Sequence, residues 1–101
     1  MSTTFEVHGK QYRAEVRAAG KPEGEKFDLY RVTVSGQKSG AVEGTMKLTT
    51  LALQTAEERA REKGGSKDEW VARAVAKSLA SEVLIRKLQP EFSFVVDHRW
   101  V

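Results

Sequence analysis

The chain has 101 residues, of which 40% are hydrophobic and 31% are charged. A chain of this length has room for one hydrophobic core that buries roughly 65% of the unfolded surface, so we expect a single domain over residues 1–101. The net charge is +3 and both halves carry cations and anions in similar numbers, which excludes a basic or acidic tail. The chain has no cysteine, which excludes disulfides, cysteine nucleophiles and thiolate metal sites.

The sequence also bears on location. Its longest apolar run is three residues, which is too short to cross a membrane. The first ten residues lack the hydrophobic region of a signal peptide. We therefore expect a soluble, cytoplasmic protein with no membrane partner.

Residues 3–49 alternate apolar and polar side chains, which is the period of half-buried β-strands. Gly9-Lys10 predicts a two-residue turn with glycine in the first position, as in a type II′ turn. Polar loops over residues 20–26 and 36–40 separate the later strands. The pattern predicts an antiparallel four-stranded meander with one apolar face and one polar face.

The loop lengths predict the register of these strands, because a one-residue slip would move every side chain to the other face. The first turn places Val7 opposite Tyr12. Symmetric closure of the second loop places Val16 opposite Tyr30, and the third loop places Tyr30 opposite Met46. Together the three loops predict continuous apolar rows on one face and neighbours of opposite charge on the other.

Residues 50–89 are helical in character. For the first helix, Thr55-Ala-Glu-Glu58 fits a capping box, and Gly64 predicts the end. Leu51 and Leu53 fit either its first turn or an extension of the fourth strand, so its beginning stays open.

Ser66 and Glu69 fit a second capping box, which opens a long helix that we expect to end at Gln89, before Pro90. At 1.5 Å per residue this helix is roughly 33 Å long, enough to lie across the sheet. Its main apolar stripe contains Val71, Ala72, Val75, Ala76, Leu79 and Val83.

Residues 91–101 alternate again and predict a fifth strand. Since the inner strands of the meander already have two neighbours, this strand must join a sheet edge or pair with another chain. Ala14 and Gly44 leave a shallow place on the apolar face where a helix could pack closely. The predicted fold is α+β: an antiparallel four-stranded meander followed by two helices packed on one face and a C-terminal fifth edge strand.

The sequence predicts no catalytic, cofactor-binding or metal site. Asp97 and His98 are adjacent on a strand, so their side chains point to opposite faces and cannot form a catalytic pair. Glu6 and His8 share a face, but two ligands are too few for a metal ion. The loop glycines join strand to strand, whereas a phosphate-binding loop leads into a helix. We therefore expect a protein that is not an enzyme, and we infer no small-molecule ligand.

The favoured function is non-enzymatic binding or assembly, with a protein partner or a second copy of the chain. The long helix has apolar residues outside its main stripe, and the last strand is apolar on both faces. Such surfaces need cover, either from a partner or from one another. The expected partner contacts are Trp70, Leu84, Leu88 and Trp100.

The alternative function is nucleic-acid binding. Between Trp70 and Gln89 the long helix carries four cations and one anion, and such a helix could lie along phosphates. The cations do not share one face, since Arg86 points nearly opposite Lys77 on the helical wheel. The expected nucleic-acid contacts are Arg73, Lys77, Lys87 and Arg99.

Overall fold

A computed structural model of the chain describes residues 1–36, 40–85 and 88–101, with the backbone only for Leu84 and Ile85. The class is α+β, as predicted. In chain order the elements are β1 (Ser2–Val7), β2 (Lys10–Gly20), β3 (Phe27–Gly36), β4 (Val42–Thr49), α1 (Thr50–Lys63), α2 (Lys67–Ile85), β5 (Phe92–Val96) and the short 3₁₀ helix η1 (His98–Trp100).

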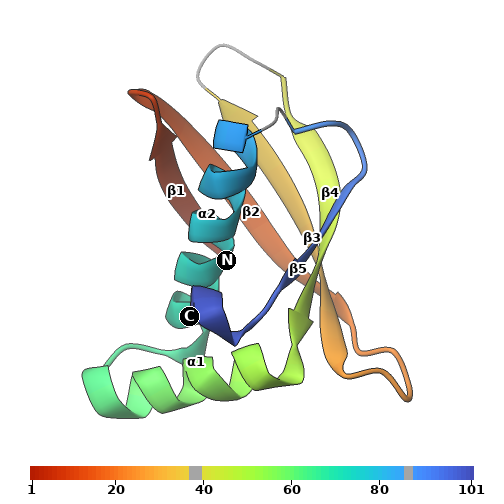
Figure 1. Cartoon of the computed structure of the whole chain (residues 1–101), viewed down its shortest axis with the longest axis vertical. Helices are drawn as coiled ribbons and strands as arrows, with labels where there is room; N and C mark the ends of the chain where they lie inside the picture. Colours follow the sequence, from red (N-terminus) through yellow and green to blue (C-terminus); the bar gives the residue numbers. More distant parts are fainter. Residues whose placement is uncertain (37–39, 86–87) are drawn as a thin grey trace.

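The strands form one five-stranded sheet in the order β1-β2-β3-β4-β5. β1 to β4 are antiparallel, as predicted, whereas β5 runs parallel to β4 with Phe94 beside Met46. A parallel neighbour needs a long crossover, which α1 and α2 provide. In Figure 1, α2 runs along one face of the sheet and α1 lies across its lower end.

The first hairpin turns one residue earlier than predicted. His8 and Gly9 are its central residues, with φ angles of 50° and 76°. Positive φ at both central positions is typical of a type I′ turn, whose twist suits the flanking strands. Val7 therefore lies opposite Lys10 and not opposite Tyr12.

The second register is also wrong, and the third is confirmed. Val16 lies opposite Val32. A bulge between Ala18 and Gly20 adds a residue on the β2 side of the pair, so the loop does not close symmetrically. Tyr30 lies opposite Met46, as the third loop predicts. Both errors amount to two residues, so every side chain keeps its predicted face.

α1 begins at Thr50, earlier than a capping box at Thr55 would place it. The N-cap is Thr49, whose hydroxyl accepts a hydrogen bond from the backbone N–H of Ala52 at 3.1 Å. Thr55 lies inside the helix and donates to the carbonyl of Leu51 at 2.8 Å. Leu51 thus belongs to the helix and does not extend β4.

α2 begins as predicted, with the Ser66 hydroxyl accepting a hydrogen bond from the Glu69 N–H at 3.2 Å. Its last described residue is Ile85, and neither Leu88 nor Gln89 is helical. The predicted helix end at Gln89 is therefore wrong.

The last strand is shorter than predicted. β5 ends at Val96, and the 3₁₀ helix η1 follows it. The carboxylate of Asp97 caps η1 by accepting a hydrogen bond from the Arg99 N–H at 2.9 Å. This local cap turns the chain away from the sheet, although the alternating pattern continues to Val101.

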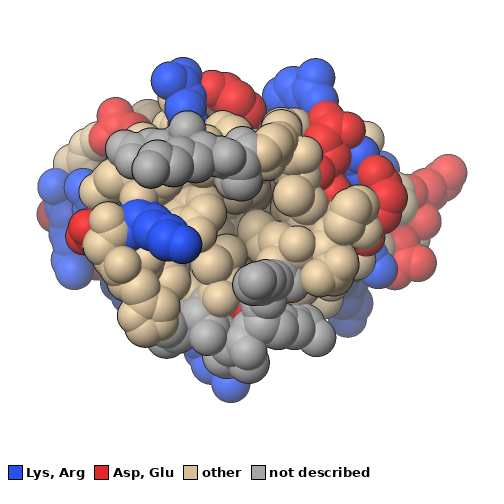
Figure 2. Space-filling model, turned by 90° about the horizontal axis from the view of Figure 1, so that it is seen from above, with Lys and Arg blue, Asp and Glu red and all other residues tan. Residues whose placement is uncertain are grey.

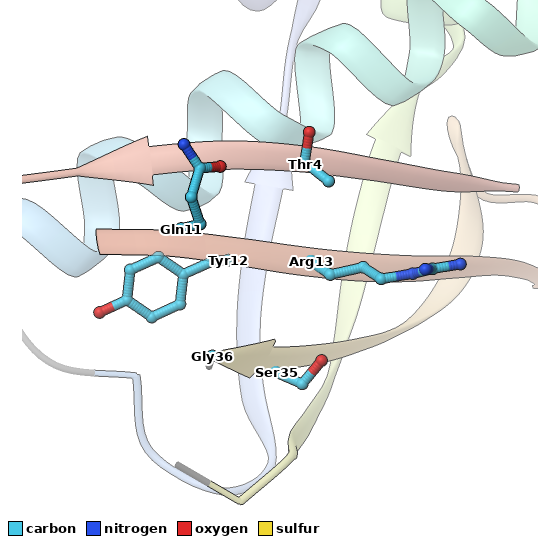
Figure 3. A pocket seen from close by; sticks show the side chains of 6 residues that line it. All are labelled: Thr4, Gln11, Tyr12, Arg13, Ser35 and Gly36. Carbon is cyan, nitrogen blue, oxygen red and sulfur yellow. The ribbon is translucent and has the colours of Figure 1, made fainter. Parts of the chain in front are cut away.

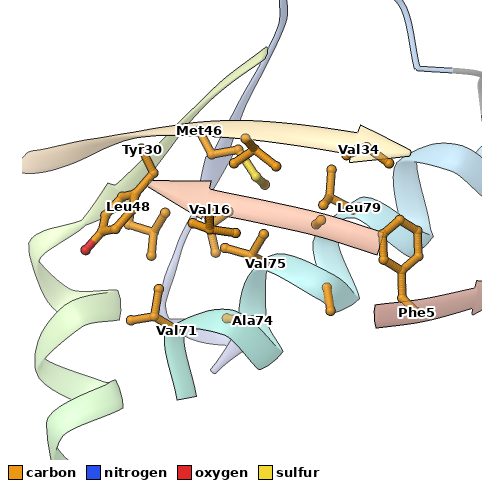
Figure 4. Packing of buried hydrophobic residues seen from close by; sticks show 14 of the residues in the cluster. Phe5, Val16, Tyr30, Val34, Met46, Leu48, Val71, Ala74, Val75 and Leu79 are labelled. Carbon is orange, nitrogen blue, oxygen red and sulfur yellow. The ribbon is translucent and has the colours of Figure 1, made fainter. Parts of the chain in front are cut away.

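The core lies between α2 and the sheet (Figure 4). Its largest fully buried side chains are Met46, Leu48, Leu79, Val16, Val32, Val71, Val75 and Val96. The predicted inward stripe of α2 is confirmed. The shallow place at Gly44, however, holds the Phe92 ring of β5 and not a helix, since an added Cβ there would overlap that ring.

Candidate binding surfaces

The predicted partner contacts pack largely against the protein's own core. Trp70, Leu88 and Trp100 are each partly buried and contact the core cluster. The indole N–H of Trp70 also donates to the Gly64 carbonyl at 2.9 Å. The side chain of Leu84 lies outside the described residues. The three described side chains thus already have internal cover.

The predicted nucleic-acid contacts are divided between α2 and η1. Arg73 and Lys77 are exposed one turn apart on α2, and Lys87 lies outside the described residues. Between its described bounds α2 carries three cations (Lys67, Arg73, Lys77) and three anions (Asp68, Glu69, Glu82), which sum to zero. Seen from above (Figure 2), basic side chains are separated by uncharged and acidic ones. Arg86 and Lys87, the other two cations behind the predicted positive charge, lie outside the described residues.

Arg99 is engaged within its own turn. Its guanidinium lies 2.7 Å from a carboxylate oxygen of Asp97. Hydrogen bonds from the Arg99 side chain, followed by the one from its backbone, lower the pKa of Asp97. The charge of Arg99 is thus compensated before any phosphate approaches. Arg73 has a different contact, since its guanidinium lies 4.5 Å from the centre of the Trp70 ring.

The sheet face opposite α2 carries a connected set of ion pairs centred on Arg31. Its guanidinium donates to both carboxylate oxygens of Glu91, to Glu43 and to the Thr45 hydroxyl, each at 3.1 Å. Arg17 lies directly opposite Arg31, contrary to the predicted alternation of charge. Glu43 compensates this repulsion, because it pairs with both guanidinium groups.

Hydrogen bonds keep the acids of this set ionised. Those from Thr33 and then Arg31 lower the pKa of Glu43, and those from Arg31 lower the pKa of Glu91. The same bonds raise the pKa of Arg31. These mutually compensated charges join β3, β4 and the residue before β5, which is a structural role.

A hollow of about 190 Å³ lies on the sheet near one end of β1, β2 and β3. In Figure 3 the side chains of Tyr12 and Arg13 point in opposite directions, and Arg13 pairs with Glu15 at 2.9 Å. A small-molecule site needs polar groups that converge, and these do not. Among the described residues, no three His, Asp or Glu side chains come together as metal ligands.

Asp28 and Tyr30 are neighbouring groups with unusual surroundings. Among the described residues, Oδ1 of Asp28 is the one buried side-chain nitrogen or oxygen atom without a hydrogen bond. It lies 4.0 Å from the Lys21 ammonium. Burial, followed by the charges of Asp28 and Asp68, raises the pKa of Tyr30. A raised pKa keeps the phenol protonated at neutral pH, so little phenolate is available as a base or nucleophile, and this pair holds no activated group.

The outer edge of β1 is an open row of backbone groups. Met1 and Val16 exchange two backbone hydrogen bonds, of 2.9 Å and 2.7 Å. Because hydrogen-bonded and non-bonded pairs alternate along an antiparallel ladder, Ser2, Thr4 and Glu6 direct their N–H and C=O groups away from β2. No other described residue bonds to these groups.

A second hollow, of about 280 Å³, lies beside this edge. Its lining consists of Met1, Ser2 and Thr3 on one side and of Asp68, Glu69, Ala72 and Arg73 of α2 on the other. An edge strand flanked by a helix is an arrangement through which domains bind an extended peptide as an added strand.

This edge is the functional candidate that sequence reasoning missed. The predicted meander has the first and fourth strands at its edges, but the sequence does not show which of them the last strand covers. Comparisons with protein-family models, curated proteins and solved structures found no match for this chain. No helix in the described part of the chain is long and apolar enough to span a membrane.

Proposed function

We propose that this protein is a non-enzymatic binding or assembly module that takes up an extended polypeptide segment as an added strand at β1. The observation that carries the proposal is the open row of backbone groups at Ser2, Thr4 and Glu6, beside the hollow under α2. The proposal keeps the functional class and the cytoplasmic location expected from the sequence. It moves the partner contacts from the tryptophans and leucines to β1.

The sequence of β1 supports this role. Edge strands are commonly protected by proline, bulges or inward-pointing charges. β1 has no proline, pairs with β2 without a bulge, and carries one charge, Glu6, which is exposed. Each backbone hydrogen bond with an added strand contributes about 0.5–1.5 kcal/mol. The outward groups of Ser2, Thr4 and Glu6 together can therefore bind a short segment.

The decisive variant is Thr4→Pro. Proline removes the outward N–H of Thr4, and the fold should survive because that group donates nothing to β2. Thr4→Ala keeps the N–H and is the matched control. With phage-displayed random peptides as the probe, we expect selected peptides to bind wild type and Thr4→Ala alike. They should bind Thr4→Pro about tenfold more weakly.

Two results would contradict strand uptake at β1: a library that yields no binding peptides, or peptides that bind Thr4→Pro as tightly as wild type. Circular dichroism checks that the variants are folded. Should Thr4→Pro unfold, Ser2→Pro tests the same edge nearer its end, where the chain is less constrained.

Nucleic-acid binding through Arg73, Lys77, Lys87 and Arg99 stays a prediction. The pairing of Arg99 with Asp97 favours strand uptake over it. Titration of a fluorescent DNA duplex at low salt tests it, because phosphate binding must weaken as salt increases.

A further inference from the structure

Building on the proposed function, we infer that the strand taken up at β1 is β1 of a second copy of this chain. Two copies then form one continuous sheet about a two-fold axis that passes beside Thr4. In this antiparallel register Thr4 lies opposite Thr4, and Ser2 lies opposite Glu6 of the second copy. The register pairs every outward-directed backbone group of both strands.

The side-chain faces of the two strands match in this register. Phe5 is buried on the α2 side of the sheet, and Val7, two residues further along the strand, is buried on the same face. Pairing about Thr4 sets Thr3 beside Phe5, and Met1 beside Val7, of the second copy. The side chain of Met1, which is 38% exposed in the single chain, thereby gains an apolar neighbour.

The register also keeps like charges apart. Glu6 is the only charged residue of β1, and it faces the small polar Ser2 of the second copy. The other sheet edge, β5, is less suited to self-pairing. β5 has five residues, and the chain turns away from the sheet into the 3₁₀ helix η1 directly after Val96, so β5 offers a shorter edge for pairing.

The hollow beside β1 leaves room for side chains of the added strand. α2 starts next to Met1 and Ser2 and runs along the same face of the sheet, so the two-fold axis places both α2 helices on one face of the joined sheet, running in opposite directions. A strand junction buries less than the roughly 1,600 Å² of a standard stable complex. We therefore expect a dissociation constant between the micromolar and near-millimolar ranges.

Sedimentation velocity over a concentration series of the full chain tests the inference. We expect a monomer–dimer equilibrium that Thr4→Ala leaves unchanged and that Thr4→Pro weakens at least about tenfold, because Thr4 lies at the centre of the junction.

Charge at Ser2 tests the register. Ser2→Lys sets a cation opposite Glu6 of the second copy, twice per dimer, and should tighten the dimer about threefold at low salt. Ser2→Glu should weaken it by a similar factor. In a Glu6→Gln background the two variants should differ much less. Glu15 also faces Ser2 within the chain. Because Glu15 is present in every variant, the comparison with the Glu6→Gln background isolates the contact between Ser2 and Glu6 of the second copy.

Three results would overturn the inference: a monomer at every concentration, a dimer that survives Thr4→Pro, or Ser2 variants that shift the equilibrium in the same direction. A monomeric chain that still binds selected peptides through Thr4 would reject the second copy as the partner and leave strand uptake standing. Failure of peptide binding as well would reject both.

Discussion

At the residue scale, Arg31 joins segments that are far apart in the chain: β3, β4 and Glu91 before β5. The pKa values of Glu43 and Glu91 are lowered in the folded protein. A lowered carboxyl pKa contributes stability that is present above the unfolded value of about 4.3 and is lost as pH falls through the folded pKa. Acid should therefore weaken the attachment of β5.

The variant Arg31→Gln tests this pH dependence. The wild-type melting temperature should fall as pH decreases below about 4.3. In Arg31→Gln the melting temperature should be lower at neutral pH and should change less on acidification. Arg13→Gln is the control, because Arg13 pairs within its own strand with Glu15. Parallel melting curves for wild type and Arg31→Gln would contradict the coupling.

Trp70 carries a second residue-scale prediction. Trp70→Phe removes the hydrogen bond to the Gly64 carbonyl and should lower the free energy of unfolding by about 0.5–1 kcal/mol. Trp100→Phe is the matched control, since Trp100 packs on the core without a comparable hydrogen bond. Urea unfolding measures both. Dimerisation should survive Trp70→Phe, and its loss would return Trp70 to the predicted partner contacts.

At the element scale, the N-cap of α1 is Thr49 and not Thr55, which the sequence predicted. Thr49→Ala removes the hydroxyl that accepts from Ala52 and should cost about 1 kcal/mol. Thr55 lies inside the helix, where alanine has the better propensity, so Thr55→Ala should change stability by less than about 0.5 kcal/mol. Urea unfolding of both variants checks this. The opposite ranking would restore the predicted capping box.

The attachment of β5 to β4 depends on Gly44. Its missing Cβ makes room for the Phe92 ring, so Gly44→Ala should destabilise the protein by about 1–3 kcal/mol. Hydrogen exchange of β5 amides should accelerate more than that of β2. Gly40→Ala is the control, because a Cβ at Gly40 would meet no atom within 4 Å. Equal effects of the two substitutions would contradict this packing.

Turn geometry explains why element types were easier to predict than registers. The alternation of residues such as Phe5, Val7 and Val16 is visible in any short window. The register of the first hairpin depended on whether the two central residues of the turn are His8 and Gly9 or Gly9 and Lys10. The sequence pattern favoured Gly9 and Lys10, which is wrong. In the structure His8 and Gly9 both have positive φ, which is the geometry of a type I′ turn and matches the twist of the strands.

At the scale of the whole molecule, stability depends on the layer between α2 and the sheet. Leu79 is fully buried there, so Leu79→Ala should lower the free energy of unfolding by about 2–5 kcal/mol. Leu51, which is 50% exposed, is the matched control, and Leu51→Ala should cost less than about 0.5 kcal/mol. Chemical unfolding compares the two. Similar losses would place the core elsewhere.

The α+β class, the meander, the two faces of the sheet and the inward stripe of α2 could all be read from the chain, because each depends on periodicity over a few residues. Contacts between distant segments decided the rest: the edge that β5 joins, the Phe92 ring over Gly44, and the internal cover of Trp70. The open edge of β1 belongs to this second group. The predicted meander already placed the first strand at one edge, but only the pairing of β5 with β4, two segments far apart in the chain, leaves that edge open.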